Sequence, residues 1–216
     1  MQPNMIGAYG PWAAAIVGEE PGRFSFRRAE WQDVEAWRPL ARQRLMALLA
    51  QPEIGGLPQV TTHKQYAYDG LHVEELSWQL SYGPRTQAIF LKPAGAVDRL
   101  PGILALHDHG GNKYFGKRKL TRTAQQQHPV MVEHRAEYYG GAPWANEIAK
   151  RGYAVLVPDA FPFASRRVLL ADVNEEIRQG LSDRDPEQVE SILAYNEWAA
   201  AHESIMAKSL FCAGTT

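Results

Sequence analysis

The residues best suited to chemistry form one stretch, His107-Asp108-His109-Gly110-Gly111, which directly follows a short apolar run. Backbone N–H groups in a turn after a strand can point at a developing oxyanion and stabilise it. Glycine lets another group approach the backbone closely and adopts angles that other residues avoid. We therefore interpret Gly110, Gly111 and Asn112 as candidate oxyanion-binding backbone groups. The alternative is an ordinary strand-to-helix turn that carries two surface histidines.

Side chains on either side of these backbone groups are candidates for contact with a substrate. They are His107, His109, Lys113 and Tyr114. Two residues further along the chain, Asp159 and Arg166, are expected to support the site from behind. Asp159 ends a predicted strand, and an ion pair with Arg166 is one way in which the two would do so.

A metal site is a second interpretation of the same stretch. His107 and His109 stand two residues apart at a predicted strand end, where alternate side chains point to the same side. This spacing is common among metal ligands, and three further residues could complete a site: His128, His134 and Asp159. A metal-dependent hydrolase therefore stays open as an alternative, whereas the main interpretation needs no metal and no cofactor.

Hydrophobic periodicity and turn signals predict the elements that must position the stretch. Five strands are expected, at residues 60–68, 72–80, 86–92, 102–106 and 153–157. The first three are expected to form an antiparallel meander. A short helix at 143–151 connects the last two, which makes a βαβ unit and therefore a parallel pair. Ligand sites in such sheets lie at the carboxyl ends of the strands, where the turn begins.

Three longer helices are expected outside this unit. One begins near Asp33, with its regular part starting near Arg38 because Pro39 suits a first turn. A second is expected at residues 168–179, and a third begins at Asp185 as its N-cap and runs to about residue 208. Residues 1–30 are expected to form an extended arm that packs four aromatic side chains onto the domain: Tyr9, Trp12, Phe24 and Phe26.

Residues 112–142 make an unusually long connection between a strand and the next helix. We interpret this segment as a lid-like insertion with a helical turn of its own. Its basic run could contact an anionic substrate or nucleic acid, and consists of Lys113, Lys117, Arg118, Lys119 and Arg122. We favour a solvated face instead, because the net charge of the whole chain is only −1.

The composition limits the class of protein. The chain has 216 residues, of which 45% are hydrophobic, and this suits one globular domain with an N-terminal extension. Its net charge of −1 gives no electrostatic case for nucleic acid or an anionic membrane as partner. A single cysteine, Cys212, excludes an intrachain disulfide. No basic stretch followed by an apolar core marks a signal peptide, so we expect a cytoplasmic protein.

Three segments carry a resemblance to a known superfamily. They are Leu104-Ala105-Leu106-His107-Asp108-His109-Gly110-Gly111, residues 144–159 around Arg151-Gly152-Tyr153, and Phe161-Pro162-Phe163-Ala164-Ser165-Arg166-Arg167. Together they resemble the N-terminal half of α/β-hydrolases, in particular the dienelactone hydrolase-like and acetyl xylan esterase-like branch. The resemblance implies an α/β fold: a three-layer sandwich with a mostly parallel sheet that starts with antiparallel strands. It also implies hydrolysis of a small-molecule ester through an acyl-enzyme.

One departure from the superfamily pattern decides what we expect of this chain. The nucleophile motif Gly-x-Ser-x-Gly does not occur in the 216 residues. In the superfamily the nucleophile, acid and base follow the segments matched here, so all three would lie beyond Thr216. We therefore expect a hydrolase truncated at its C-terminal side and inactive alone, with an arm and helix at residues 1–56 and a partial domain at 57–216.

The competing interpretation is a protein without catalytic activity. An unfinished parallel sheet would leave an unpaired strand and apolar surface. Such a remnant or subunit would bind a second copy of itself, or a C-terminal partner chain, through the open edge of its sheet.

Overall fold

The computed structural model describes residues 5–53, 55–183 and 187–215. Contacts divide the chain into two compact units, one of Met1–Pro52 with Leu210–Thr216 and the other of Glu53–Ser209. This division differs from the expected one because the last residues group with the N-terminal segment. All the strands described, and the His107 to Gly111 turn, belong to the second unit.

The N-terminal unit contains the helices α1 (Gly10–Val17) and α2 (Val34–Leu49). Asp33 is the N-cap of α2 and accepts a hydrogen bond from the backbone N–H of Glu35 at 2.9 Å, as expected for a helix that begins here. The prediction that the regular part of the helix begins near Arg38 is wrong, because the helix already begins at Val34. Pro39 lies inside the helix and removes one backbone hydrogen-bond donor.

The predicted extended arm is also wrong in part, because residues 10–17 are helical. Two of its aromatic side chains pack on tryptophans of the same unit. Phe24 stacks on Trp31 with ring centroids 6.4 Å apart, and Phe26 packs on Trp37 at 5.3 Å. Tyr9 and Trp12 are exposed.

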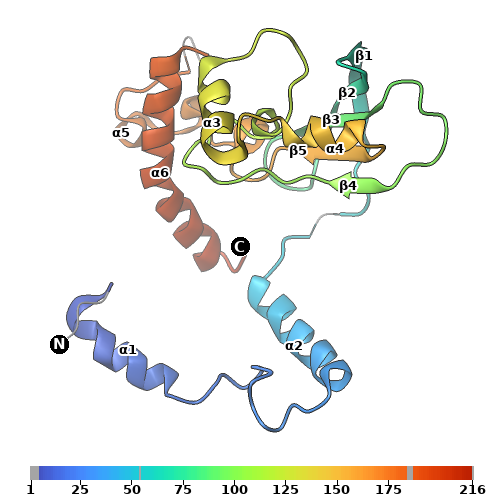
Figure 1. Ribbon diagram of the computed structural model, residues 1–216. Coiled ribbons are helices and arrows are strands. Elements are labelled where there is room, and N and C mark those ends of the chain that lie inside the picture. The colour runs from blue at the N-terminus through green and yellow to red at the C-terminus, as the bar shows by residue number, and fades with distance from the viewer. Residues whose placement is uncertain (1–4, 54, 184–186, 216) are drawn as a thin grey trace. The chain divides into compact units, whose positions relative to one another are not determined.

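The second unit is built on one five-stranded sheet in the order β1-β2-β3-β5-β4 (Figure 1). Its strands are β1 (Thr61–Tyr68), β2 (Leu71–Trp78), β3 (Thr86–Pro93), β4 (Gly102–Leu104) and β5 (Ala154–Pro158). The first three form the predicted meander, and the β4–β5 pair is parallel, as the βαβ unit required. A mostly parallel sheet is wrong, because β5 joins the meander antiparallel to β3.

The strand register gathers the apolar side chains on one face. Val73 lies opposite Leu91, which lies opposite Val155 on its other side. All three are fully buried. The helix α4 (Trp144–Lys150) covers this face and buries Ala145 and Ala149 completely. Burial of this face holds β5, and with it β4, against the meander.

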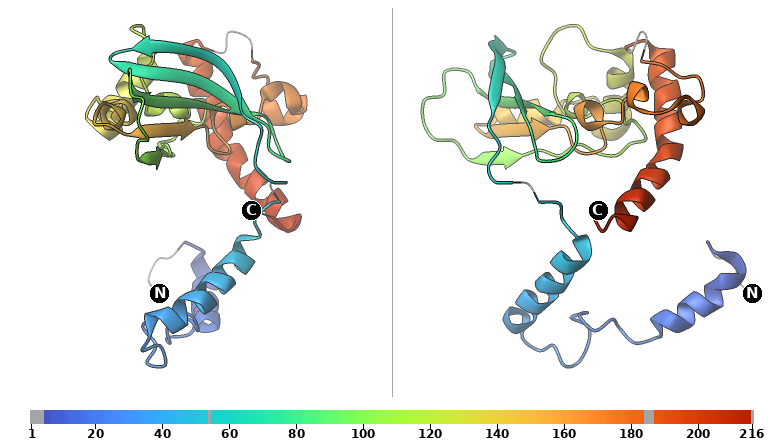
Figure 2. Two further views of the ribbon diagram at one scale, coloured as in Figure 1. Left: turned by 90° about the vertical axis from the view of Figure 1, so that its right-hand side faces the viewer. Right: turned by 180° about the vertical axis from the view of Figure 1, so that it is seen from behind.

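The opposite face of the meander is mixed, because Leu76 and Ala88 share it with polar side chains and Ala88 is buried. On β2, His72 and Glu74 form a contact of 2.8 Å between His72 Nε2 and a Glu74 carboxylate oxygen, and Lys92 of β3 lies opposite His72. Side chains of this kind stay in contact with water on a half-covered antiparallel sheet. The helix α4 packs on β2, β3 and β5, and the three-layer sandwich stays a prediction. Figure 2 shows this twisted meander from two further sides.

Three more helices complete the second unit: α3 (Pro129–Tyr139), α5 (Glu175–Arg178) and α6 (Val189–Cys212), whose last residues belong to the other unit. The predicted helix at residues 168–179 is wrong. A 3₁₀ turn at Leu170–Asp172 and the single turn of α5 replace it. Leu170 packs with Tyr195 and Trp198 of α6, so tertiary packing overrides the local helical pattern. The predicted cap at Asp185 lies outside the described residues.

No helix within residues 5–53, 55–183 and 187–215 combines the length and apolar character that a membrane crossing requires.

Leu91 tests whether the buried face of the sheet stabilises the second unit. Leu91→Ala removes a fully buried side chain and should lower the free energy of unfolding by about 2–5 kcal/mol. Leu57→Ala is the matched control, because Leu57 is 94% exposed and should change stability by less than about 0.5 kcal/mol. Urea denaturation followed by circular dichroism measures both values. Equal losses for the two variants would contradict this account of the core.

Candidate functional site

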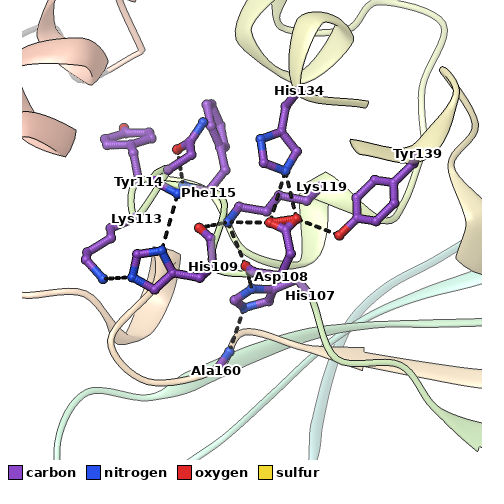
Figure 3. Close-up of polar contacts among 12 residues, drawn as sticks. His107, Asp108, His109, Lys113, Tyr114, Phe115, Lys119, His134, Tyr139 and Ala160 are labelled. Carbon is purple, nitrogen blue, oxygen red and sulfur yellow. Dashed lines mark hydrogen bonds and ion pairs between the residues drawn. The ribbon is translucent and has the colours of Figure 1, made fainter. Parts of the chain in front are cut away.

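The His107 to Gly111 turn lies at the carboxyl end of the parallel strand pair. The N–H of Ala105 donates to the carbonyl of Leu156 at 2.8 Å, which continues the β4–β5 ladder for one residue beyond Leu104. The chain then leaves the sheet as a turn (Figure 3). This is the predicted position, at the edge where α/β sheets place their ligand sites.

The two glycines are required by the shape of the turn. Gly110 and Gly111 have φ values of +44° and +64°, in the left-handed region. A Cβ atom on Gly110 would lie 2.6 Å from His134 Cε1 and 2.7 Å from Asp108 Oδ2, whereas one on Gly111 would meet no atom within 4 Å. Gly110 is therefore fixed both by its backbone angle and by its neighbours.

A buried lysine holds the turn from beneath. The side chain of Lys119 is fully buried, and its Nζ donates to the carbonyl oxygens of Asp108 at 2.9 Å and His109 at 3.0 Å. The Asp108 carboxylate lies 3.4 Å from the same Nζ. Burial lowers the pKa of Lys119 to about 8, although the charge of Asp108 opposes this shift. Two successive peptide groups of the turn are thus oriented by one ammonium group.

This clamp decides which way the backbone donors of the turn point. In a trans peptide group the N–H is directed opposite to the C=O. The carbonyls of Asp108 and His109 point at Lys119, so the N–H groups of His109 and Gly110 point to the other side of the turn. The N–H of Gly111 is directed at His109 Nδ1, at 3.3 Å. Of the predicted oxyanion donors, Gly110 is therefore the one that this geometry favours most directly.

The Asp108 carboxylate is held by donors on α3. His134 Nε2 lies 2.9 Å from Asp108 Oδ1, and the Tyr139 hydroxyl donates to the same oxygen at 2.5 Å. Burial alone would raise the pKa of Asp108, but the hydrogen bonds from Tyr139 and His134 and the charge of Lys119 leave it below its ordinary value. Burial and Asp108 together raise the pKa of Tyr139 to about 12. Asp108 is therefore an ionised carboxylate that ties α3 to the turn.

His107 braces the turn instead of facing a substrate. Its Nε2 accepts a hydrogen bond from the backbone N–H of Ala160 at 3.0 Å, so its proton is on Nδ1, which donates to the Asp108 carbonyl at 3.0 Å. Burial lowers the pKa of His107 and favours this neutral form. Both ring nitrogens of His107 are thus hydrogen-bonded to backbone groups.

His109 and Lys113 lie together against α6. Lys113 Nζ lies 2.9 Å from His109 Nε2 and 2.8 Å from a carboxylate oxygen of Glu203. The Lys113 side chain is only 2% exposed, whereas that of His109 is 58% exposed. Of the two predicted substrate contacts, His109 is thus the accessible one, and Lys113 joins the turn to α6.

Asn112 and Tyr114 are likewise held by α6. Asn196 accepts hydrogen bonds from the backbone N–H groups of Lys113 and Tyr114, both at 2.9 Å. Its side-chain amide donates to Asn112 Oδ1 at 3.2 Å. The Tyr114 ring packs edge-on against Tyr195 at 5.9 Å. These contacts fix the segment after the turn, and they place Tyr114 among aromatic side chains.

The predicted ion pair between Asp159 and Arg166 is wrong. Asp159 instead accepts from Lys117 Nζ at 2.8 Å and from the Ser165 hydroxyl at 2.7 Å. Arg166 donates to the carbonyls of Tyr82 and Pro84. Asp159 therefore anchors the start of the insertion, and Arg166 anchors the loop between β2 and β3. The sequence left the partner of Asp159 ambiguous, because any cation near the end of this strand could pair with its carboxylate.

The metal interpretation finds no assembled ligand set. Among the residues described, no group of three or more His, Cys, Asp or Glu side chains is arranged to hold a metal ion. His107 and His109 were expected on one side of a strand, but β4 ends at Leu104 and both lie in the turn. There the alternation of a strand no longer applies. His107 bonds to Ala160, and His134 bonds to Asp108.

Two of the five cations in the basic run are buried, so a solvated face describes only part of it. Lys113 and Lys119 are 2% and 0% exposed. Sequence reasoning therefore missed the roles of Lys119, His134 and Tyr139, which all contact Asp108. Their place in the insertion was the available signal, but a long connection does not predict which of its side chains turn inward.

Comparisons with known proteins bear on the fold. No protein-family model matches the chain, and no curated protein matches its sequence. A Bacteroides fragilis protein assigned as an acetyl xylan esterase is similar in structure, with a TM-score of 0.56 and 18% identity over 90% of this chain and 48% of its own. A glucuronoyl esterase from Solibacter usitatus has a TM-score of 0.38 and 12% identity, over 82% of this chain and 50% of its own.

The chain therefore spans about half the length of these two structures. The first similarity supports an α/β fold.

The two glycines of the turn provide a matched pair of variants. Gly110→Ala and Gly111→Ala both place an L-residue at positive φ, at about 1–2 kcal/mol each. Only Gly110→Ala also meets His134 and Asp108. We expect Gly110→Ala to lower the free energy of unfolding by about 1–3 kcal/mol more than Gly111→Ala. Urea denaturation measures the difference, and losses of the same size would contradict the close packing at Gly110.

The pKa of Lys119 predicts a pH dependence of stability. Its value of about 8 in the native state lies below the ordinary 10.5. Between these values the unfolded chain holds a proton that the native chain has lost, so stability rises with pH in this window. Lys119→Met cannot show this rise. The difference in unfolding free energy, wild type minus Lys119→Met, should grow by about 1–3 kcal/mol from about pH 7 to about pH 10.

Lys208→Met is the control for this measurement, because Lys208 is exposed. Its difference from wild type should stay constant over the same pH range. A flat or falling difference for Lys119→Met would show that Lys119 keeps its proton as an ordinary lysine does.

Proposed function

We propose that this chain supplies the oxyanion-binding part of an ester hydrolase of the α/β-hydrolase type. The observation that carries the proposal is the turn after β4, in which Lys119 holds two carbonyls and thereby directs the N–H of Gly110 to the opposite side. An ester carbonyl placed there would gain negative charge on attack, and oriented N–H groups stabilise such charge. The similarity in fold to a protein assigned as an acetyl xylan esterase is consistent with this class of substrate.

The proposed reaction needs a nucleophile that these residues do not supply. In an acyl-enzyme route a nucleophile attacks the ester carbon, the alcohol leaves, and water then releases the acid. Ser165, the first serine after the turn along the chain, is engaged with Asp159 through its hydroxyl and is not part of a nucleophile elbow. We therefore propose that the chain is inactive alone and that another segment completes the site.

The free edge of β4 supports this view of where the completing segment would pair. On one side β4 pairs with β5, and no other strand within the described residues pairs with its second side. Leu104 and Leu106 are 61% and 59% exposed beside this edge. A parallel strand added here would place its carboxyl end next to the turn, because neighbouring parallel strands end at the same edge of a sheet.

Hydrolysis of p-nitrophenyl acetate tests the proposal. We compare the 216-residue chain with the product of the uninterrupted reading frame that contains it. The chain alone should show only the background rate, and a longer product should turn over. In that product Lys119→Met should lower kcat at least about tenfold with little change in KM, because the oriented donors act on the transition state.

Lys208→Met is again the control and should leave kcat unchanged. Turnover by the chain alone at the rate of a complete esterase would contradict the missing nucleophile. An inactive chain whose reading frame stops at Thr216 would contradict the esterase proposal.

The exposed edge of β4 also supports a second candidate function, binding of another chain by strand addition. An unpaired edge with apolar side chains is a template for such pairing. Size-exclusion chromatography with light scattering should then detect a dimer or larger species. Leu104→Lys should return it to a monomer, because a charged edge residue blocks strand addition. A wild-type monomer at all concentrations would contradict self-association through this edge.

A further inference from the structure

The insertion lines a concave site that is separate from the turn. It is a cavity of about 250 Å³, and every residue that lines it comes from positions 118 to 135. No residue of the turn contributes to it. The volume is sufficient for a small ligand group together with a few waters, each of which occupies about 30 Å³ in the liquid.

Three arginines line this cavity: Arg118, Arg122 and Arg135. Among the described residues that line it, none is Asp or Glu. Arg118 is neutralised in part by Glu187, at 2.7 Å between Nη1 and a carboxylate oxygen. Arg135 and Arg122 therefore place about two positive charges around the cavity, and neither has a carboxylate partner among the residues that the structure describes.

Within the described part of the chain, Arg135 is held by neutral groups. Its side chain is buried, with the residue 3% exposed. Its Nη1 donates to the carbonyl of Arg118 at 2.9 Å, and its Nη2 donates to the side-chain oxygen of Gln127. Burial, and then the charges of Arg122 and Arg118, lower the pKa of Arg135. Burying a guanidinium among like charges is unfavourable unless an anion compensates it.

Arg122 has an unused donor in the same place. Its Nε is buried and has no hydrogen-bond partner among the residues that the structure describes. Its Nη2 makes only one contact, to Gln125 at 3.3 Å. The backbone of Arg122 is held on both sides by Asn146, so the side chain is fixed at its base. Buried donors without partners are rare in native proteins and point to a missing acceptor.

The beginning of α3 adds to the positive potential. His128 is the N-cap of this eleven-residue helix and lines the cavity, as does Met131 in the first turn. His128 Nδ1 accepts from the N–H of Val130, so its proton is on Nε2, which donates to the carbonyl of Glu187. His128 is therefore neutral, and the helix end contributes only its dipole.

We propose that this cavity binds a doubly charged oxyanion, either the phosphate monoester group of a small molecule or a free sulfate or phosphate ion. Two uncompensated guanidiniums match a dianion in charge, and the fork of each guanidinium matches its oxygens in geometry. A carboxylate brings one negative charge and would leave one arginine uncompensated. The site is independent of ester hydrolysis, because it shares no residue with the turn.

Isothermal titration of the 216-residue chain with inorganic phosphate, sulfate and acetate tests the proposal at matched, low ionic strength. Phosphate and sulfate should each bind at one saturable site, and acetate should bind at least about tenfold more weakly. Arg122→Gln should weaken phosphate binding at least about tenfold. Arg151→Gln, which removes the same charge from an exposed position outside the cavity, should bind phosphate as the wild type does.

Thermal unfolding gives a second readout. Phosphate should raise the melting temperature of the wild type, by mass action on the native state. Without phosphate, Arg122→Gln should melt at or above the wild-type temperature because a like charge is gone, and phosphate should not raise it further. Should this variant fail to fold, Arg122→Lys keeps the charge, loses the buried Nε–H and should bind phosphate more weakly than the wild type.

Three outcomes would overturn the proposal. One is no saturable binding of phosphate or sulfate. Another is equal loss of binding in Arg122→Gln and Arg151→Gln, which would mean that the anions bind to surface cations in general and not to the cavity. The last is acetate binding as tightly as phosphate, which would assign the cavity to carboxylates.

Discussion

The buried ammonium group of Lys119 is the interaction on which the candidate site depends. It lies beneath the turn and holds the carbonyls of Asp108 and His109 within hydrogen-bond distance. A buried charge is stable only when polar partners replace its water. The turn supplies those partners, and in return the orientation of its peptide groups is set. Glycine suits position 110 on two grounds, because φ is positive there and a Cβ would lie within 3 Å of His134 and Asp108.

The insertion is the structural support of this turn rather than a loose cover over it. Lys119, His134 and Tyr139 all come from residues 112–142, and all three contact Asp108. The same segment contributes the three arginines that line the cavity: Arg118, Arg122 and Arg135. One stretch of chain thus uses some of its cations to orient backbone carbonyls and leaves others facing a concave site. An anion bound among the arginines would stabilise the segment that holds the turn.

The sheet needs only one parallel pair to present the turn. β4 and β5 run parallel and end at the same edge of the sheet. There His107 accepts a hydrogen bond from the backbone N–H of Ala160. The antiparallel meander contributes the buried face on which this pair rests. The free side of β4 is the part of this arrangement that the described residues leave unpaired, and its apolar side chains Leu104 and Leu106 are exposed.

The sequence by itself determined the local elements of this fold. Alternation predicted the meander, the βαβ unit followed from two apolar runs around a short helix, and the glycines located the turn, because each of these signals is contained in a few neighbouring residues. Only the tertiary structure decided the rest: the antiparallel pairing of β5 with β3, the two short turns in place of a helix at residues 168–179, and the partners of Lys119, Asp159 and Arg166. Whether a lysine faces water or two carbonyls depends on chain segments far from it in sequence, and no local pattern encodes that choice.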